Sequence, residues 1–361
     1  MTTREVHPTY EPRPPEPRPP EVRASEPRAS APGPPAPRPS EVRASEPRPG
    51  RVRLVLGALA VAATVPYLLL KAAWVAGSHL GIPADSVLRE PGPVLLVANA
   101  VTLAMDACVI LLVLVFTRPW GMRVPAWLLT VPVFVATGLL TPILFGFSGQ
   151  LLARALGFGA DADVDVDGAG GQQPFLDPWV PDLVYAGFTV QGLALAGLFV
   201  PYARERWGRL WQGVPGERLP PSTGVMAAAA AVVGAAVGGA HLYWAFGGTA
   251  GLAEERVASW SVEASVGSVV HGVCAVVAGA VAVLLARGGR RGARWPLAVA
   301  WTSSAATACW GLWMLTAYAG QDFGPAEETT LVMYLPYAGQ MITGLLSVAV
   351  LTRFLISRRP A

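Results

Sequence analysis

Long apolar segments most strongly limit how this chain can fold. About 20 apolar residues cross a bilayer core as a helix. The chain of 361 residues is 53% hydrophobic and 14% charged, with a mean hydropathy of +0.44, outside the usual balance of a soluble domain. The sequence therefore predicts an all-α membrane protein with eight transmembrane helices, at 54–76, 93–116, 125–147, 183–202, 225–246, 262–286, 296–319 and 331–356.

The arginines predict the orientation of these spans. With eight spans, fifteen arginines of residues 51–361 fall on one side of the membrane and three, Arg89, Arg154 and Arg256, on the other. Positive charge is concentrated on the cytoplasmic side of membrane proteins. We therefore expect a multi-pass protein of the cytoplasmic membrane with both termini in the cytoplasm. Because the basic residues flank the spans, they are interpreted as topology determinants, and nucleic acid is not an expected partner.

Residues 1–50 differ in composition from the rest of the chain. They contain 15 prolines and almost no large apolar side chains, so they cannot bury enough surface to offset the entropy of ordering. The sequence predicts a disordered cytoplasmic tail with polyproline II character. The tail is either a linker, a ligand for a cytoplasmic partner that recognises proline, or a segment in weak contact with acidic lipid.

Two parts of the chain share a motif and its surroundings. A Trp-x-x-Gly-x-x-x-Gly pattern occurs twice, 170 residues apart, and it comprises Trp74, Gly77 and Gly81 in the first part and Trp244, Gly247 and Gly251 in the second. The sequence therefore predicts two four-helix pseudo-repeats, 51–215 and 220–361. Since each has an even number of spans, the repeats are expected to be parallel.

The second copy of the motif carries a family resemblance. Residues 241–248 read His-Leu-Tyr-Trp-Ala-Phe-Gly-Gly. This run resembles the H-x-Y-W-A-x-G-G signature of a family of small four-span actinobacterial membrane proteins of unknown function. The resemblance covers the second half, because the first half has Lys71 where the histidine would stand. It implies a four-helix membrane fold and no particular activity.

Ionisable residues within apolar spans of the first half are candidates for function. Charged side chains at the centre of a span cost roughly 2.5–3.5 kcal/mol on insertion scales. Lys71 lies in the first span, Asp106 in the second, and Asn99 near the start of the second. If these helices are neighbours, Lys71 can reach the Asp106 carboxylate. The pair is either a proton or cation relay, a substrate anchor, or a structural ion pair with the lysine extended to the interface.

Two histidines stand in the second half at matching depths. His241 is near the end of the fifth span and His271 is about nine residues into the sixth, so antiparallel helices would bring the imidazoles face to face. This arrangement suits axial ligation of a haem or binding of a metal, with Cys274 one turn away. The alternative is a hydrogen-bonded pair that packs the bundle.

The segment between the third and fourth spans is rich in aspartate. Asp163, Asp165 and Asp167 followed by Gly168 match the first half of a calcium-binding loop. The twelfth position is Pro174 rather than glutamate, so the second half of the pattern is absent. A solvated acidic loop is the alternative to a calcium site.

Motifs of soluble catalysis are absent from the sequence, which has no G-x-S-x-G, P-loop or H-E-x-x-H pattern. The leading hypothesis is a membrane protein that handles a small molecule or ion at the interface of its two halves. A haem or metal redox protein using His241 and His271 is the first alternative. A non-catalytic envelope scaffold that recruits a partner through its tail is the second.

Overall fold

The computed structural model describes residues 50–84, 86–89, 92–158, 176–208, 216, 218–258, 260–289, 292–319 and 330–358. These residues form helices and their connections, and they form no strand beyond an isolated bridge between Gly216 and Gly289. The predicted tail up to residue 49 lies outside them, as do Asp163, Asp165 and Asp167. The disorder of the tail and the calcium site therefore stay predictions.

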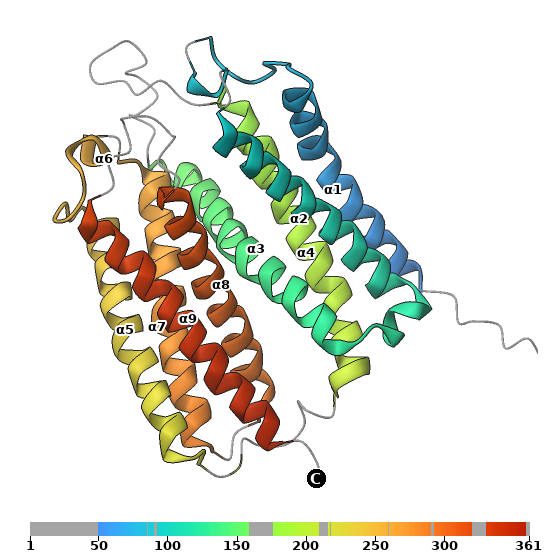
Figure 1. Cartoon of the computed structure of the whole chain (residues 1–361), viewed down its shortest axis with the longest axis vertical. Helices are drawn as coiled ribbons and strands as arrows, with labels where there is room; N and C mark the ends of the chain where they lie inside the picture. The colour runs from blue at the N-terminus through green and yellow to red at the C-terminus, as the bar shows by residue number, and fades with distance from the viewer. Residues whose placement is uncertain are drawn as a thin grey trace, which may run out of the picture. The chain divides into compact units, whose positions relative to one another are not determined.

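Long helices dominate the described residues. They are α1 (Arg51–Val75), α2 (Pro93–Thr117), α3 (Ala126–Ala155), α4 (Trp179–Trp207), α5 (Pro221–Ala245), α7 (Val262–Arg287), α8 (Arg294–Ala319) and α9 (Leu331–Ser357) (Figure 1). Three short helices lie in the connections, namely η1 (Val87–Arg89), η2 (Pro119–Arg123) and α6 (Glu254–Ala258). The all-α class predicted from the sequence is confirmed for this part of the chain.

Seven of the described helices are long and apolar enough to cross a membrane. The exception among the long helices is α8, which has 26 residues but contains four tryptophans and several hydroxyl side chains. Indoles and hydroxyls lower the hydropathy of a helix without shortening it. The predicted span at 296–319 coincides with α8, so the eighth crossing stays a prediction.

Several helices extend beyond the apolar segments that predict them. The third apolar segment ends at residue 147, but α3 continues to Ala155. Similarly, α4 begins at Trp179 and ends at Trp207, whereas the apolar segment covers 183–202. The reason is that backbone hydrogen bonding continues past the apolar core, since polar residues such as Arg154 and Arg204 are good helix formers.

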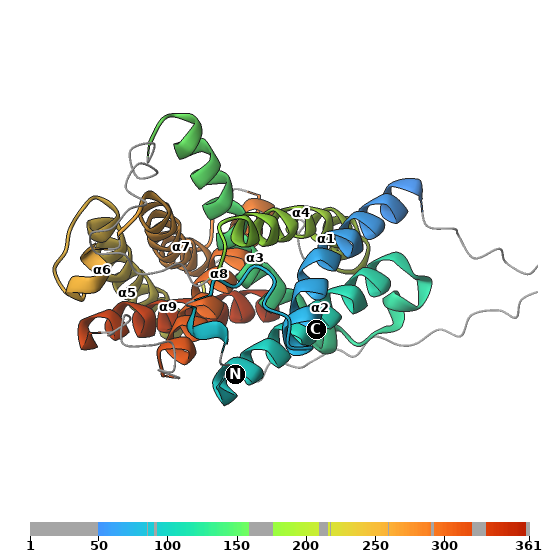
Figure 2. The same cartoon turned by 90° about the horizontal axis from the view of Figure 1, so that it is seen from above.

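The helices pack in two sets. In the first set, α1 contacts α4 and α2, and α3 contacts α4; in the second set, α5 contacts α7 and α9, and α8 contacts α9 and α7. The two sets meet where α3 lies against α8 and α7, as Figure 2 also shows. At this seam the Trp301 indole donates to Thr137 Oγ1 at 3.3 Å and the Trp310 indole donates to the Leu139 carbonyl at 3.1 Å.

Glycines allow α5 and α7 to approach to backbone contact. A Cβ atom on Gly234 would lie 2.6 Å from the Ala275 carbonyl oxygen, and one on Gly279 would lie 2.7 Å from the Ala230 carbonyl oxygen. Small residues of this kind are the usual basis of close helix association in membranes. Any larger residue at Gly234 or Gly279 would therefore force the two helices apart.

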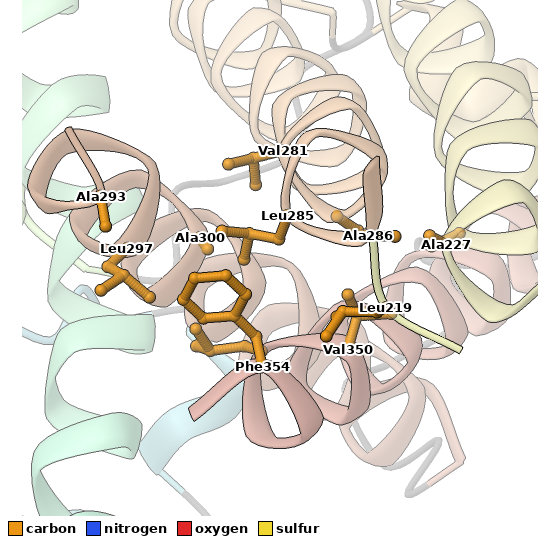
Figure 3. Close-up of a cluster of buried hydrophobic side chains, with 13 residues drawn as sticks. Leu219, Ala227, Val281, Leu285, Ala286, Ala293, Leu297, Ala300, Val350 and Phe354 are labelled. Carbon is orange, nitrogen blue, oxygen red and sulfur yellow. The ribbon is translucent and has the colours of Figure 1, made fainter. Parts of the chain in front are cut away.

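The cores of the two sets differ in composition. In the second set, small alanines surround a few larger side chains, with Leu285, Val350 and Phe354 at the centre (Figure 3). In the first set the core side chains are larger and more aromatic, with Phe116 packed 5.0 Å from Tyr202 and 5.7 Å from Phe199 between ring centroids. The first set therefore combines packing of large side chains with a glycine contact at Gly187 of α4, whose Cβ would lie 2.9 Å from the Ala63 carbonyl oxygen of α1.

The two copies of the tryptophan–glycine motif form the same turn at the ends of α1 and α5. Trp74 Nε1 donates to the Leu80 carbonyl at 2.8 Å, and Trp244 Nε1 donates to the Ala250 carbonyl at 3.0 Å. The motif's glycines all have positive φ, which other residues rarely adopt, with values of 88° at Gly77, 73° at Gly81, 91° at Gly247 and 84° at Gly251.

Candidate functional site

A polar cluster lies between α1 and α2 in the first set. Lys71 Nζ donates to Asn99 Oδ1 at 2.5 Å, and it lies 5.2 Å from the ring centroids of both Tyr67 and Trp74. Lys71 follows Tyr67 by four residues and precedes Trp74 by three, so the three side chains share one face of α1. Aromatic rings and an amide oxygen thus surround the ammonium group, and both stabilise its charge.

Asp106 belongs to the same stripe of α2 but lies deeper in the helix. Asn99, Thr102 and Asp106 are spaced by three and four residues, which places them on one face. Asp106 is 4% exposed, and its Oδ2 atom makes no hydrogen bond to the described residues. A buried carboxylate oxygen without a partner is costly in an apolar environment. It is therefore the strongest sign of a function in this set.

Lys71 and Asp106 interact electrostatically without forming a direct ion pair. The sequence predicted that Lys71 could reach the Asp106 carboxylate, and in the structure its ammonium donates to Asn99 instead. Asp106 follows Asn99 by seven residues, which separates them by about 10 Å along α2. A proton or small ion that moves between the two side chains would have to cross the space between the Lys71 ammonium and the Asp106 carboxylate.

A second cluster joins α5, α7 and α9 in the other set. The rings of His241 and His271 lie 5.7 Å apart between centroids, as the antiparallel arrangement of their helices leads one to expect. His241 is 3% exposed, and neither of its ring nitrogens makes a hydrogen bond to the described residues. Gln340 Nε2 lies 3.1 Å from His271 Nδ1, and its side chain also has a weak polar interaction with His241.

Aromatic side chains enclose the two histidines. Trp244 lies 5.5 Å and Tyr337 lies 6.1 Å from His241, and Trp310 lies 5.3 Å from His271, between ring centroids. Trp310 also bonds to the Leu139 carbonyl of α3, so this cluster touches the seam between the sets. Within the described part of the chain, no three His, Cys, Asp or Glu side chains gather closely enough to hold a metal ion together, and Cys274 does not complete such a group.

Two buried glutamines, one on α4 and one on α9, belong to the polar interior but are not among the site residues predicted from the sequence. Gln191 and Gln340 are each 1% exposed, and each has a side-chain oxygen without a hydrogen bond among the described residues. The signal was present in the sequence, since an amide in an apolar span needs a polar partner. Tyr67, Trp310 and Tyr337 carried no such signal, because aromatic residues are common in membrane helices.

Arg154 forms an ionic cluster at the end of α3. Its guanidinium lies 3.3 Å from Glu263 at the start of α7 and 3.7 Å from Asp182 at the start of α4. These side chains are 40–54% exposed, so the two ion pairs are weak. The cluster links the two sets at one end of the seam, and it explains why an arginine stands among acidic residues there.

No family model matches the chain, and neither the curated proteins nor the solved structures include a match. The resemblance to four-span actinobacterial proteins therefore stays a prediction. The helices themselves support a coarser conclusion. With seven described helices long and apolar enough to cross a bilayer, the chain is a multi-pass, all-helical membrane protein.

Proposed function

We propose that this protein handles a proton or small ion within its first helix set, with Asp106 as the acceptor and Lys71 as the fixed positive charge. The observation that carries the proposal is the buried Asp106 carboxylate with an oxygen that has no hydrogen bond. Ionisable residues inside membrane helices are rare, and they usually mark ion or proton pathways.

The contacts of Lys71 and Asp106 favour proton or ion transfer at this site over a structural ion pair between the two residues. A structural ion pair in a membrane needs direct contact and further hydrogen bonds, but Lys71 bonds to Asn99 and leaves Asp106 Oδ2 without a partner. Proton uptake by Asp106 would neutralise its carboxylate. The positive charge of Lys71 would remain, stabilised by the rings of Tyr67 and Trp74. The surroundings can therefore accommodate both the deprotonated and the protonated form of Asp106.

The position of the cluster refines the hypothesis based on the sequence. That hypothesis placed ion handling at the interface of two halves, but Lys71 and Asp106 lie inside the first set. The seam instead contains indole hydrogen bonds and a close contact of Gly138, whose Cβ would lie 2.5 Å from the Ala305 carbonyl oxygen. We therefore assign ion handling to the α1–α2 contact.

Proton flux in liposomes tests the proposal. Purified protein is reconstituted with a trapped pH-sensitive dye, and a potassium diffusion potential drives protons across the membrane. We expect a faster internal pH change than in empty liposomes, and a rate reduced to the empty-liposome background in Asp106→Asn. The asparagine keeps the size of the side chain but cannot exchange a proton at neutral pH.

Glu254→Gln is the matched control, because Glu254 is an exposed carboxylate on the short helix α6. This variant should conduct protons like the wild type. A wild-type rate equal to that of empty liposomes, or an unchanged rate in Asp106→Asn, would contradict the proposal. The infrared carboxyl band of the protein in lipid offers a second readout, since a protonated Asp106 should contribute intensity that Asp106→Asn lacks.

We also infer that the two sets are parallel four-helix repeats, that α8 is an eighth span and that both termini are cytoplasmic. The supporting observations are the equivalent turns at Trp74 and Trp244 and the same pairing of helices in the two sets, in which α1–α2, α1–α4 and α3–α4 correspond to α5–α7, α5–α9 and α8–α9. Reporter fusions after residue 216 and after residue 358 should both report the cytoplasm. A periplasmic signal from either fusion would refute the eight-span topology.

Haem binding by His241 and His271 is a second candidate, and the helix packing weighs against it. A Cβ atom on Gly272 would lie 3.2 Å from the His241 Cβ and 3.1 Å from the Gly238 carbonyl oxygen. Helices in such contact leave no slot of porphyrin width beside the two rings. An absorption spectrum of the purified protein decides the question, because a Soret band lost in His271→Ala would restore the haem interpretation.

A scaffold that recruits a partner through the tail stays a separate prediction. Deletion of residues 2–50 should then abolish partner capture while sparing membrane insertion. Unchanged capture by the truncated protein would refute this role.

A further inference from the structure

The His241–His271 cluster has an environment that helix packing alone does not explain. Both ring nitrogens of His241 and the side-chain oxygen of Gln340 are buried without a well-formed hydrogen bond among the described residues, and Gln340 is the polar neighbour of His241. Leaving buried polar atoms without partners costs roughly 1–3 kcal/mol each. A phenylalanine would fill the same space beside Trp244 without that penalty. Nitrogen lone pairs retained at such a position indicate a ligand that accepts them.

We propose that His241 and His271, oriented by Gln340, bind one monovalent copper ion, Cu(I). The proposal is independent of proton handling at Asp106, which lies in the other helix set.

The spacing of the rings fits a shared metal ion. With metal–nitrogen bonds of about 2.0–2.1 Å, as for zinc, an imidazole places its ion about 3.2 Å from the ring centroid. Two centroids 5.7 Å apart then bracket one ion with a nitrogen–metal–nitrogen angle of roughly 125°. An ion with only two ligands prefers a nearly linear arrangement, so binding requires the rings, which are inclined by 37°, to rotate and move apart by roughly 0.7 Å.

The charge of the surroundings selects a monovalent ion. Within the described helices, no third His, Cys, Asp or Glu joins the two histidines. A divalent ion would leave two charges without compensation in apolar surroundings, which is strongly unfavourable. Cu(I) carries one charge and is stable with two or three ligands, and imidazole is among the ligands that suit copper.

The first helix set provides an independent indication that the ion bound near His241 carries a single positive charge. Lys71 stands 170 residues before His241, and each precedes by three residues the tryptophan that bonds back to its own turn. The ammonium of Lys71 lies 5.2 Å from the Trp74 ring, and the ring of His241 lies 5.5 Å from Trp244. One set thus holds a covalently attached single positive charge where the other presents free nitrogen donors.

Gln340 fits the role of an orienting residue. Its amide lies 3.1 Å from His271 Nδ1, and the oxygen and nitrogen of an amide exchange places on a half-turn. With the oxygen toward His271, Nδ1 donates and the Nε2 lone pair is free for the metal. Histidine ligands are commonly oriented by such a bond, and its loss typically lowers metal affinity by about 10- to 100-fold.

Competition for Cu(I) tests the site. The full-length protein is purified in mild detergent with a tag that contains no histidine, kept anaerobic with ascorbate, and titrated against a coloured Cu(I) chelator. We expect one Cu(I) per wild-type chain and an affinity at least about tenfold lower in His241→Phe and His271→Phe, with Gln340→Leu weakened by about 10- to 100-fold. His79→Phe, which removes an exposed histidine, should bind like the wild type.

Failure to bind Cu(I) in the wild type, or wild-type affinity in His241→Phe, would overturn the proposal. If the phenylalanine variants do not give a monodisperse protein, X-ray absorption of wild-type copper decides instead. Imidazole scattering from two ligands would support the site, and sulfur ligands from cysteine or methionine would refute it. Asp106→Asn should keep full copper affinity, so the failure of one proposal is distinguishable from that of the other.

Discussion

Replacement of Gly234 by alanine tests the backbone contact between α5 and α7. The added Cβ would lie 2.6 Å from the Ala275 carbonyl oxygen and 3.0 Å from Thr343 Cγ2. An ordinary contact of these atoms needs at least about 3.4 Å, so α5 must move by most of an ångström or the Ala275 peptide must tilt. Overpacking of this kind typically costs about 1–3 kcal/mol.

The intrinsic helix preference acts in the opposite direction. Alanine is about 1 kcal/mol more favourable than glycine inside a helix, so the net destabilisation by Gly234→Ala is expected to be roughly 0–2 kcal/mol. Gly239→Ala is the matched control on the same helix, because nothing lies within 4 Å of its Cβ position. It should be neutral or stabilising by up to about 1 kcal/mol.

Thermal unfolding in detergent, followed by tryptophan fluorescence, measures the difference between these two variants. We expect Gly234→Ala to melt a few degrees below Gly239→Ala. Equal melting temperatures, or a more stable Gly234→Ala, would refute backbone contact at this position.

Three further changes probe the turns and the ionic cluster, each by the same melting assay. Trp244→Phe removes the indole bond to the Ala250 carbonyl and should destabilise by about 0.5–1.5 kcal/mol; an unchanged melting temperature would show that the bond is not formed. Gly251→Ala should cost at least about 1 kcal/mol, because the position has a φ of 84°, and a stabilising effect would contradict that conformation. Arg154→Gln should change stability by less than about 1 kcal/mol, since its partners are half exposed; a larger loss that persists in high salt would contradict weak pairing.

Hydropathy located the helices well because each long apolar segment must cross the membrane or be buried. The same rule failed to find which faces meet. In α2, Leu96, Val101 and Leu111 are exposed while Val109 and Leu112 are buried, so apolar residues occupy both surfaces of the helix. Lipid is as apolar as a helix interface, and therefore no amphipathic pattern marks the contact.

In the candidate sites too, the depth of a residue in its helix could be predicted from the sequence, whereas its contact partner on another helix could not. The neighbouring depths of His241 and His271 followed from the antiparallel order of their spans, and the structure places their rings together. The hydrogen-bond partner of Lys71 could not be predicted from the sequence. Asn99 and Asp106 share one face of α2, and only the height of α1 relative to α2 determines which of them Lys71 contacts. Gln340 came from α9, a helix distant in sequence from α7, so no local pattern could assign it to His271.

The contrast between the two helix contacts has a mechanical consequence. Where α5 and α7 touch, added Cβ atoms on Gly234 and Gly279 would meet backbone atoms of the opposite helix, which cannot move aside by a change of rotamer. Between α1 and α2, by contrast, a Cβ on Gly57 would meet only side-chain atoms of Val113 and Thr117, at 3.3 Å. Rotamer changes of Val113 and Thr117 can therefore absorb a small displacement between α1 and α2, although Gly187 of α4 keeps α1 in backbone contact on its other side. The α1–α2 contact is thus more compliant than the α5–α7 contact, so a helix displacement in this protein should begin at α2 before it reaches α5 or α7.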